Sequence, residues 1–199
     1  MHTRYPLVLA TRNAGKIAEM RSLLSDLPLT VYNVSDFPNA PVVDEDAPTL
    51  DGNALKKATA LFHHTGYAAL ADDTGLEVDA LGGKPGVHSA RFASPNATDA
   101  DNRRHLIDKL DGTDTRAARF RTVIAFVEDG HTHYFEGICE GQILTAERGD
   151  GGFGYDALFQ PDGYDRTFAE LSRDEKNAIS HRGRAVRAFV DFLNQRYAG

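Results

Sequence analysis

A polar turn near the start of the sequence has the residue types that bind phosphate. Residues 11–16 read Thr-Arg-Asn-Ala-Gly-Lys and lie between an apolar run and a stretch with helical periodicity. A strand that passes through a glycine-containing turn into a helix directs backbone N–H groups and the positive helix terminus at one point, and Lys16 adds a cation. The turn is not a Walker A loop, because Ala10 and Ile17 stand where that motif requires Gly and Ser or Thr. It predicts a phosphate-binding segment, with a plain strand–helix turn as the alternative.

Two groups of acidic residues have the chemistry that Mg²⁺ requires. Asp72 and Asp73 follow the apolar residues 67–71, at the predicted carboxyl end of a strand, where open α/β sheets bind their ligands. Residues 44–46 read Asp-Glu-Asp on a predicted loop, and carboxylates from two segments suit a hard cation completed by water and phosphate. Since adjacent strand residues point to opposite faces, at most one of the two aspartates is expected to face the site. The alternative is that Asp72 turns the chain and the loop acids are solvated.

Aromatic and basic residues later in the chain have the types that bind a nucleotide base. Residues 151–156 read Gly-Gly-Phe-Gly-Tyr-Asp, where glycines let the backbone approach a flat ligand and Phe153 or Tyr155 can stack on it. Lys176 can bind phosphate as a point charge, and residues 180–182, Ser-His-Arg, can donate to a carbonyl on a base. Taken alone, each segment is explained more simply as a glycine-rich turn or a solvated basic helix face.

Alternating strands and helices are predicted to position these residues. Apolar runs predict strands over residues 7–10, 67–71, 120–127, 133–144 and 157–159. Helical spacing predicts helices around residues 17–27, 55–62, 106–110 and 186–193, with loops at residues 37–50 and 82–86. Asp129-Gly130 predicts a hairpin turn, and Thr98 and the pair Ser172 and Glu175 predict helix N-termini. The pattern is typical of an α/β domain with a mixed sheet, and we expect residues 1–199 to form a single domain.

Composition excludes several classes of protein. The chain has 199 residues, 41% hydrophobic and 26% charged, which is ordinary for a globular domain. Its longest apolar runs are too short to cross a bilayer, and its N-terminus lacks the pattern of a secretion signal. With a single cysteine, these features predict a cytoplasmic protein with no membrane partner. A net charge of -7 disfavours binding to nucleic acid, although local cations and a metal can still hold a small anion.

Five segments together resemble the inosine triphosphate pyrophosphatase family. They read LATRNAGKIAEM, NALKKA, ADDTGLEVDALGGKPGVHSARF, GGFGYDALF and ELSRDEKNAISHRGRA, in family order over nearly the whole chain. The resemblance implies an α/β fold with an elongated mixed β-sheet flanked by helices, two lobes around a central cleft, and a homodimer. It also implies Mg²⁺-dependent hydrolysis of non-standard purine nucleoside triphosphates, namely ITP, dITP and XTP, to the monophosphate and pyrophosphate, which removes them from the nucleotide pool.

The matching positions imply a role for each site residue. The triphosphate-binding segment of the family matches Thr11, Arg12, Asn13, Ala14, Gly15 and Lys16. Its metal-binding acids match Glu45 and Asp73, and Asp73 also matches the proton acceptor. The remaining nucleotide contacts match Thr74, Phe153, Gly154, Tyr155, Asp156, Lys176, His181 and Arg182. The chain departs from the family at Arg12, where many relatives carry Gly, and at Gly52, where Glu is common.

Two other functions stay open at this point. One is a pyrophosphatase of related fold that acts on modified pyrimidine or 7-methylated nucleotides; the Phe-Gly-Tyr-Asp and Ser-His-Arg segments favour purines instead. The other is a nucleotide sensor without catalysis, which does not need metal-binding acids on two segments. A haloacid-dehalogenase-type phosphatase is excluded, because the sequence Ala-Asp-Asp-Thr-Gly lacks the spaced Asp-x-Asp of that chemistry.

Overall fold

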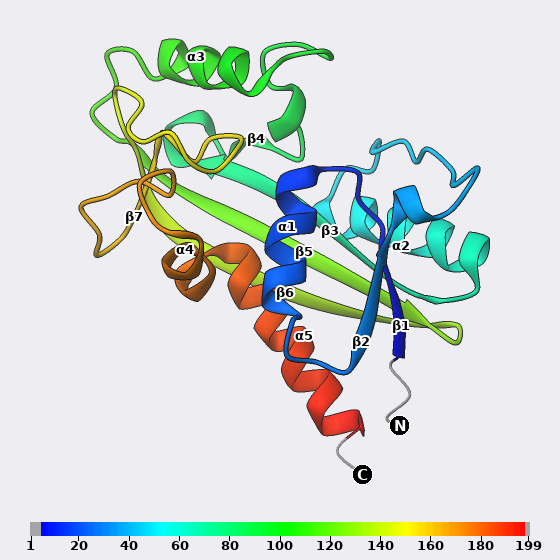
Figure 1. Ribbon diagram of the computed structural model, residues 1–199. Helices are drawn as coiled ribbons and strands as arrows, with labels where there is room; N and C mark the ends of the chain where they lie inside the picture. Colours follow the sequence, from blue (N-terminus) through cyan, green and yellow to red (C-terminus); the bar gives the residue numbers. More distant parts are fainter. Residues whose placement is uncertain (1–4, 198–199) are drawn as a thin grey trace. The chain divides into compact units, whose positions relative to one another are not determined.

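The computed structural model describes residues 5–197, which contain a mixed seven-stranded sheet flanked by helices (Figure 1). The strands are β1 (Tyr5–Leu9), β2 (Leu29–Asn33), β3 (Ala68–Val78), β4 (Lys84–Gly86), β5 (Ala117–Glu128), β6 (His131–Ile143) and β7 (Phe159–Pro161). The helices are α1 (Ala14–Leu23), α2 (Leu50–Thr65), α3 (Asp99–Lys109), α4 (Arg173–Ile179) and α5 (His181–Tyr197), with short 3₁₀ turns at Val34–Asp36, Asp79–Leu81 and Ser89–Arg91. None of the helices among these residues is long and apolar enough to span a membrane.

Parallel and antiparallel pairing coexist in the sheet, as the sequence predicted. The strand order is β2-β1-β3-β5-β6-β7, and β4 pairs with β3 outside this path. Strand β1 is parallel to both β2 and β3, whereas β4 is antiparallel to β3 and β7 to β6. Asp129 and Gly130 both have positive φ values, 43° and 78°, between β5 and β6, which confirms the predicted hairpin turn.

The described chain divides into two compact units. The first unit contains residues 5–73, 122–137 and 183–197, and the second contains residues 74–121 and 138–182. Strands β3, β5 and β6 and helix α5 contribute residues to both units. The boundary within β3 falls between Asp73 and Thr74, so these two predicted site residues are chain neighbours assigned to different units.

Alternation of side chains along the strands gives the first unit two apolar layers. Along β3, Leu70 packs with α1 and α5, whereas Ala71 packs with α2. The same alternation continues to Asp72 and Asp73, because successive strand residues point to opposite faces. Asp72 therefore lies on the face of α1 and Asp73 on the face of α2, as the period of two predicted.

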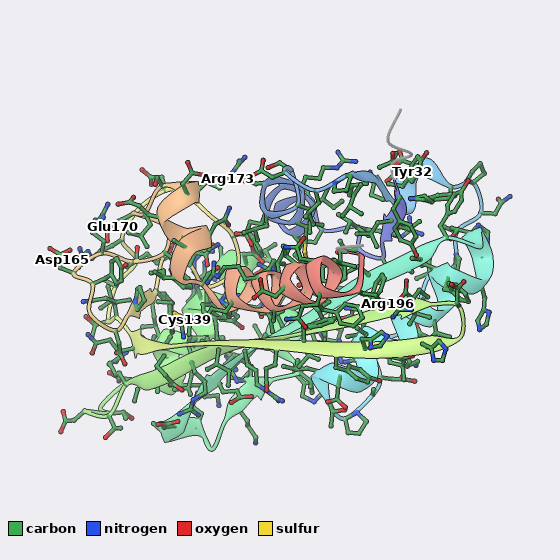
Figure 2. The ribbon with its side chains drawn as sticks, turned by 90° about the horizontal axis from the view of Figure 1, so that it is seen from below. Tyr32, Cys139, Asp165, Glu170, Arg173 and Arg196 are labelled. Atoms are coloured by element: carbon green, nitrogen blue, oxygen red, sulfur yellow. The ribbon has the colours of Figure 1, made fainter. Side chains whose placement is uncertain are left out.

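The core of the second unit is rich in aromatic side chains. The ring of Phe120 lies 4.7 Å from that of Phe159 and 5.9 Å from that of Phe168, measured between centroids. Leu106 of α3, the adjoining C-cap residue Leu110 and Cys139 of β6 are buried in the same cluster; Cys139 is labelled in Figure 2. Helix α3 begins after Thr98, the predicted N-cap, whose side chain also forms a reciprocal capping box with Asp101.

Several strands differ from prediction. Strand β3 runs to Val78, so Asp72 and Asp73 lie inside a strand and not at its carboxyl end. Acidic side chains are tolerated there because lysine side chains pair with them. Strands β2 and β4 were not predicted, because both are short and acquire their conformation by pairing with β1 and β3. Strand β7 begins at Phe159, two residues later than predicted, because the preceding residues form turns.

Two helices also differ from prediction. Helix α1 starts at Ala14 and ends at Leu23, about one turn before the end of the predicted periodicity at residue 27. The predicted C-terminal helix is two helices, because Ser180 has an extended ψ of 158° that interrupts the ladder between α4 and α5. The capping box of Ser172 and Glu175 at the start of α4 is confirmed. The break places His181 and Arg182 at the first turn of a new helix.

Candidate active site

The predicted phosphate segment forms the start of α1 and contacts β3. Asn13 is the N-cap: its side chain accepts a hydrogen bond from the Lys16 N–H at 3.0 Å, and Thr11 Oγ1 accepts one from the Asn13 N–H at 3.2 Å. By helix geometry, the N–H groups of Ala14 and Gly15 have no acceptor within the helix. Lys16 Nζ lies 3.1 Å from Asp72 Oδ2. The turn thus offers backbone donors and one ammonium group to an anion.

Arg12, which departs from the family pattern, reaches a neighbouring loop. Its guanidinium donates to the Ala40 carbonyl at 3.1 Å. The side chain therefore ties the phosphate segment to the loop that precedes the acidic residues 44–46. This contact gives the extra cation a structural role in the first unit.

The two predicted metal-binding acids meet at a buried lysine that the sequence did not single out. Lys57 Nζ, on α2, lies 2.9 Å from Glu45 Oε1 and 3.0 Å from Asp73 Oδ1, and it donates to the Asp72 carbonyl at 2.8 Å. Lys57 is only 8% exposed. One ammonium group thus gathers the acidic loop and β3, and we call these residues, with Lys16, the acidic cluster.

Asn53 connects the same two segments one helical turn earlier. Its Oδ1 accepts from the Ala47 N–H at 2.9 Å, and its Nδ2 donates to Asp73 Oδ2 at 3.2 Å. Asn53 and Lys57 are four residues apart, so they share the face of α2 that buries Ala54 and other apolar residues. Two polar residues on an otherwise apolar helix face are the signal in the sequence that could have identified Asn53 and Lys57 as functional candidates.

The departure at Gly52 has a steric explanation. A Cβ atom at this position would lie 2.8 Å from the Cβ of Ala47, which is shorter than real side chains tolerate. Glycine therefore lets residues 45–49 approach α2 closely, and this approach brings Glu45 to Lys57.

Burial and charge shift the pKa values of the acidic cluster in different directions. Burial raises the pKa of Asp73 above its ordinary value, despite the nearby Lys57 and Lys16. Burial opposes ionisation of Glu45 too, but the charges of Lys57 and Lys16 outweigh it and lower the pKa of that carboxyl. Burial disfavours the charged form of Lys57, yet Asp73, Asp72 and Glu45 together raise its pKa. With all these groups ionised, three carboxylates and two ammonium groups leave a net negative charge.

The acidic cluster fits a divalent metal that is shared with a phosphate. Within residues 5–197, no group of three or more His, Cys, Asp and Glu side chains is arranged to bind a metal by protein ligands alone. Mg²⁺ in phosphate-transfer sites usually takes one or two carboxylates and completes its shell with substrate oxygens and water. Glu45 and Asp73 supply such a donor set, since both contact one ammonium nitrogen and the cluster keeps negative charge.

Several predicted nucleotide contacts of the second unit lie around Phe153. Lys176 Nζ lies 4.9 Å and Arg182 Cζ 5.6 Å from the centre of the Phe153 ring. Lys176 also pairs with Asp156 Oδ2 at 2.6 Å, and Arg182 donates to Thr74 Oγ1 at 3.1 Å. The structure therefore brings five of the predicted residues together, and we call them the aromatic cluster.

Two other predicted residues lie deeper in the second unit. Tyr155 is only 4% exposed, its hydroxyl donates to the Ser89 carbonyl at 2.8 Å, and burial raises its pKa above the ordinary value. His181 is buried and stacks on Phe120, with ring centroids 4.6 Å apart. Of the two aromatic rings considered from the sequence, the half-buried Phe153 is therefore the better candidate to stack on a base.

A cavity of about 330 Å³ lies beside the Phe153 loop. It is lined by residues of α3 and of the glycine-rich segment: Asp99, Arg103, Glu147, Gly149, Asp150, Gly151, Gly152, Phe153, Gly154, Asp156 and Ala157. The backbone of Gly152 and Gly154, with φ of 73° and 60°, is available only to glycine without strain. The second unit thus has open space next to its candidate stacking ring.

Known proteins share both the sequence and the fold. The model of the Ham1 family matches residues 7–192. A dITP/XTP pyrophosphatase of Desulforamulus reducens is 50% identical over 194 residues, covering 96% of each chain, and one of Geobacter sulfurreducens is 48% identical over 190 residues, covering 94% of this chain and 96% of the relative. The structure of a HAM1 protein from Coxiella burnetii superposes with a TM-score of 0.87 at 41% identity, covering 96% of this chain and 99% of that one. The Staphylococcus aureus Ham1 protein gives 0.86 at 36% identity, with the same coverage.

Fold and relatives together define the class: the chain is an enzyme, a nucleoside-triphosphate pyrophosphatase. It belongs to the Ham1 family. This confirms the resemblance inferred from the five sequence segments and the predicted fold class of a mixed sheet flanked by helices.

Asn53 offers a first test of the acidic cluster. In the variant Asn53→Ala, the half-buried Ala47 N–H loses its acceptor and the buried Asp73 loses a donor, so we expect the free energy of unfolding to fall by about 1–3 kcal/mol. Urea denaturation measures this change. Asn53→Asp keeps the acceptor for Ala47 but places a carboxylate against Asp73, and it is expected to be at least as destabilising. Stability equal to the wild type in both variants would contradict the bridging role.

Proposed function

We propose that this enzyme hydrolyses ITP, dITP and XTP to the monophosphate and pyrophosphate in a Mg²⁺-dependent reaction, and so clears non-standard purine nucleotides from the cytoplasmic pool. The observation that carries the proposal is the acidic cluster, in which Glu45 and Asp73 meet at Lys57 beside the phosphate-type start of α1. Two similar proteins, from D. reducens and G. sulfurreducens, are named dITP/XTP pyrophosphatases, which supports this choice of substrates.

The triphosphate would be bound by the first unit. Lys16 and the N–H groups at the start of α1 are placed to donate to phosphate oxygens, and Lys57 adds a second ammonium group. Glu45 and Asp73 would hold Mg²⁺. Bound there, Mg²⁺ would supply positive charge to offset the charge that develops on the phosphates and would lower the pKa of the attacking water.

Asp73 is proposed to orient the attacking water. Lys57 and Asn53 each contact one oxygen of its carboxylate, so its plane is held by two partners on α2. A carboxylate that also holds Mg²⁺ is a poor base, because the adjacent cation favours its charged form. We therefore assign Asp73 the orientation of the water, whose proton would be released through the pKa that the metal lowers.

The base would be selected by the aromatic cluster. A purine can stack on Phe153, and the cationic groups of Arg182 and Lys176, which lie near the same ring, can donate hydrogen bonds to that base. Hypoxanthine and xanthine carry a 6-keto acceptor, whereas adenine carries an amino donor at that position. Donors left without an acceptor are penalised by about 1–3 kcal/mol each, so the proposed site disfavours ATP. GTP shares the 6-keto group, so its exclusion has to arise at the 2-position.

Arg182 provides the test of this selection. We expect Arg182→Ala to lower the ratio of kcat/KM for ITP over ATP by about 5- to 100-fold, because ATP no longer leaves this donor unpaired. Arg182→Gln, which keeps a donor, is the more conservative variant for a residue that is only 1% exposed. Arg173→Ala, which changes an exposed arginine at the start of α4, is the matched control (Figure 2). An unchanged ratio in both Arg182 variants would place base selection elsewhere.

Product analysis tests the function as a whole. Purified protein is given ITP, XTP, GTP and ATP with Mg²⁺ and then with EDTA, and pyrophosphate and orthophosphate are measured separately. Pyrophosphate from ITP and XTP, little from ATP and none in EDTA is the expected result. Binding of ITP without turnover would favour a nucleotide sensor, and turnover of modified pyrimidine or 7-methylated nucleotides alone would favour the related pyrophosphatase. We also propose a homodimer, which sedimentation equilibrium tests independently.

A further inference from the structure

Helix α3 holds the Phe153 loop through a single residue, Gly154. The Gly154 N–H donates to Asp99 Oδ2 at 2.7 Å, and Arg103 Nη1 donates to the Gly154 carbonyl at 2.9 Å. Asp99 and Arg103 are four residues apart and therefore lie on one face of the helix. Both backbone polar groups of Gly154 are thus bonded to two side chains of the same helix.

The residues around Gly154 are anchored as well. The Phe153 N–H donates to Asp156 Oδ2 at 2.8 Å, and the Tyr155 hydroxyl donates to a backbone carbonyl in the core. Arg103 has its own orientation set by Glu147, whose Oε1 lies 2.9 Å from its Nε. Gly154 adopts a φ of 60°, a left-handed conformation that glycine reaches without strain. The backbone on both sides of the Phe153 ring is therefore held at defined points.

We propose that Asp99 and Arg103 are positioning residues that set the orientation of the Phe153 ring and so the selectivity for the purine base. They contact the loop through the backbone of Gly154, so they act on the ring indirectly. The inference rests on the proposed function, in which Phe153 is the stacking platform. A platform that is held in place before the ligand arrives loses less entropy on binding, and releasing it weakens binding.

Loss of the contacts from α3 is predicted to change KM more than kcat. The residues proposed to bind triphosphate and metal belong to the first unit, whereas Asp99, Arg103 and Phe153 belong to the second. Loss of the α3 contacts is therefore expected to raise KM for ITP by about tenfold, the equivalent of one charge-assisted hydrogen bond, with little change in kcat. The preference for ITP over ATP should fall in parallel, which a purely structural role would not produce.

The test compares Asp99→Ala and Arg103→Met with Asp108→Ala, an exposed aspartate of the same helix. Steady-state kinetics on ITP and ATP and thermal unfolding are measured for each, and Asp99→Asn, which keeps an acceptor oxygen, should restore part of the KM. Each change is repeated in a Phe153→Ala background, where it should have no further effect on KM if it acts through the ring.

Each outcome decides the inference. Wild-type KM and selectivity in both Asp99→Ala and Arg103→Met would overturn it, and so would effects that add fully to those of Phe153→Ala. A wild-type KM for Phe153→Ala itself would instead show that the base-pocket assignment under the proposed function is wrong, and the inference would fall with it. Raised KM values that vanish in the Phe153→Ala background, with folding intact, are the expected result.

Discussion

Replacing Asp73 by Asn is expected to lower kcat for ITP hydrolysis by about 10²- to 10⁴-fold at saturating Mg²⁺. Asn is nearly isosteric, so the packing against α2 is retained, but the variant lacks the charge that holds a cation and the second carboxylate oxygen that orients the attacking water. Asp73 is the group at which the proposed metal and water functions meet, and for this reason its loss should outweigh that of any single phosphate contact. Near-normal turnover would refute the mechanism proposed for the acidic cluster.

The same variant should behave in the opposite way in a stability measurement. Because burial raises the pKa of Asp73 above 3.8, the folded protein binds this proton more tightly than the unfolded chain does. The contribution of Asp73 to stability therefore increases as the pH falls through its folded pKa towards 3.8, and it is unfavourable at pH 7. We expect Asp73→Asn to leave the free energy of unfolding at pH 7 unchanged or higher in the absence of metal.

Two readouts separate catalysis from folding in this experiment. Urea denaturation in EDTA follows the stability, and initial rates of pyrophosphate release follow the activity. Asp191→Asn, which changes an exposed aspartate on α5, serves as the control for loss of one negative charge. An inactive Asp73→Asn variant that is also strongly destabilised would mean that this carboxylate is held for structural reasons, contrary to the proposal.

The second large effect is expected at Lys57. In Lys57→Met, which keeps a similar volume, the buried Asp73 carboxylate and the Asp72 carbonyl lose their shared donor. Removing one partner of a buried ion pair usually lowers the free energy of unfolding by about 3–5 kcal/mol, because the remaining charge is left without compensation. We expect a loss of this size in EDTA, with partial recovery when Mg²⁺ is added, since the ion can neutralise the same carboxylates.

Lys56 provides a matched control one position away. It pairs with Asp46 on the surface, where side chains are 41% and 72% exposed, and exposed pairs contribute at most about 1 kcal/mol. The free energy of unfolding of Lys56→Met should therefore be close to that of the wild type. Equal destabilisation by the two substitutions, or no recovery of Lys57→Met with Mg²⁺, would contradict the central place given to Lys57.

The pH dependence of the Lys57 effect follows from the directions of the pKa shifts. A raised lysine pKa contributes stability that is present below the unfolded value of 10.5 and is lost as the pH rises through the folded value. A lowered pKa at Glu45 contributes stability that is present above 4.5 and is lost as the pH falls through the folded value. The difference in the free energy of unfolding between wild type and Lys57→Met is therefore expected to be largest at neutral pH and to shrink at low and at high pH.

The sequence by itself determined the features that depend on neighbouring residues. The turn at Asp129-Gly130, the helix N-cap at Thr98 and the capping box beginning at Ser172 were all predicted and found, because each is formed by side chains and backbone within four residues. The family was also determined by sequence, since its five segments occur in family order over nearly the whole chain and are specific in combination.

Only the tertiary structure decided which side chains work together. Lys57 meets Glu45 and Asp73 across 12 and 16 residues of sequence, and no pattern within α2 predicts that a lysine on its apolar face is paired. Similarly, Tyr155 is committed to the core by a hydrogen bond 66 residues away, which leaves Phe153 as the candidate platform. Such pairings depend on how strands and helices pack, and a buried charge is stable only where the fold supplies its partner.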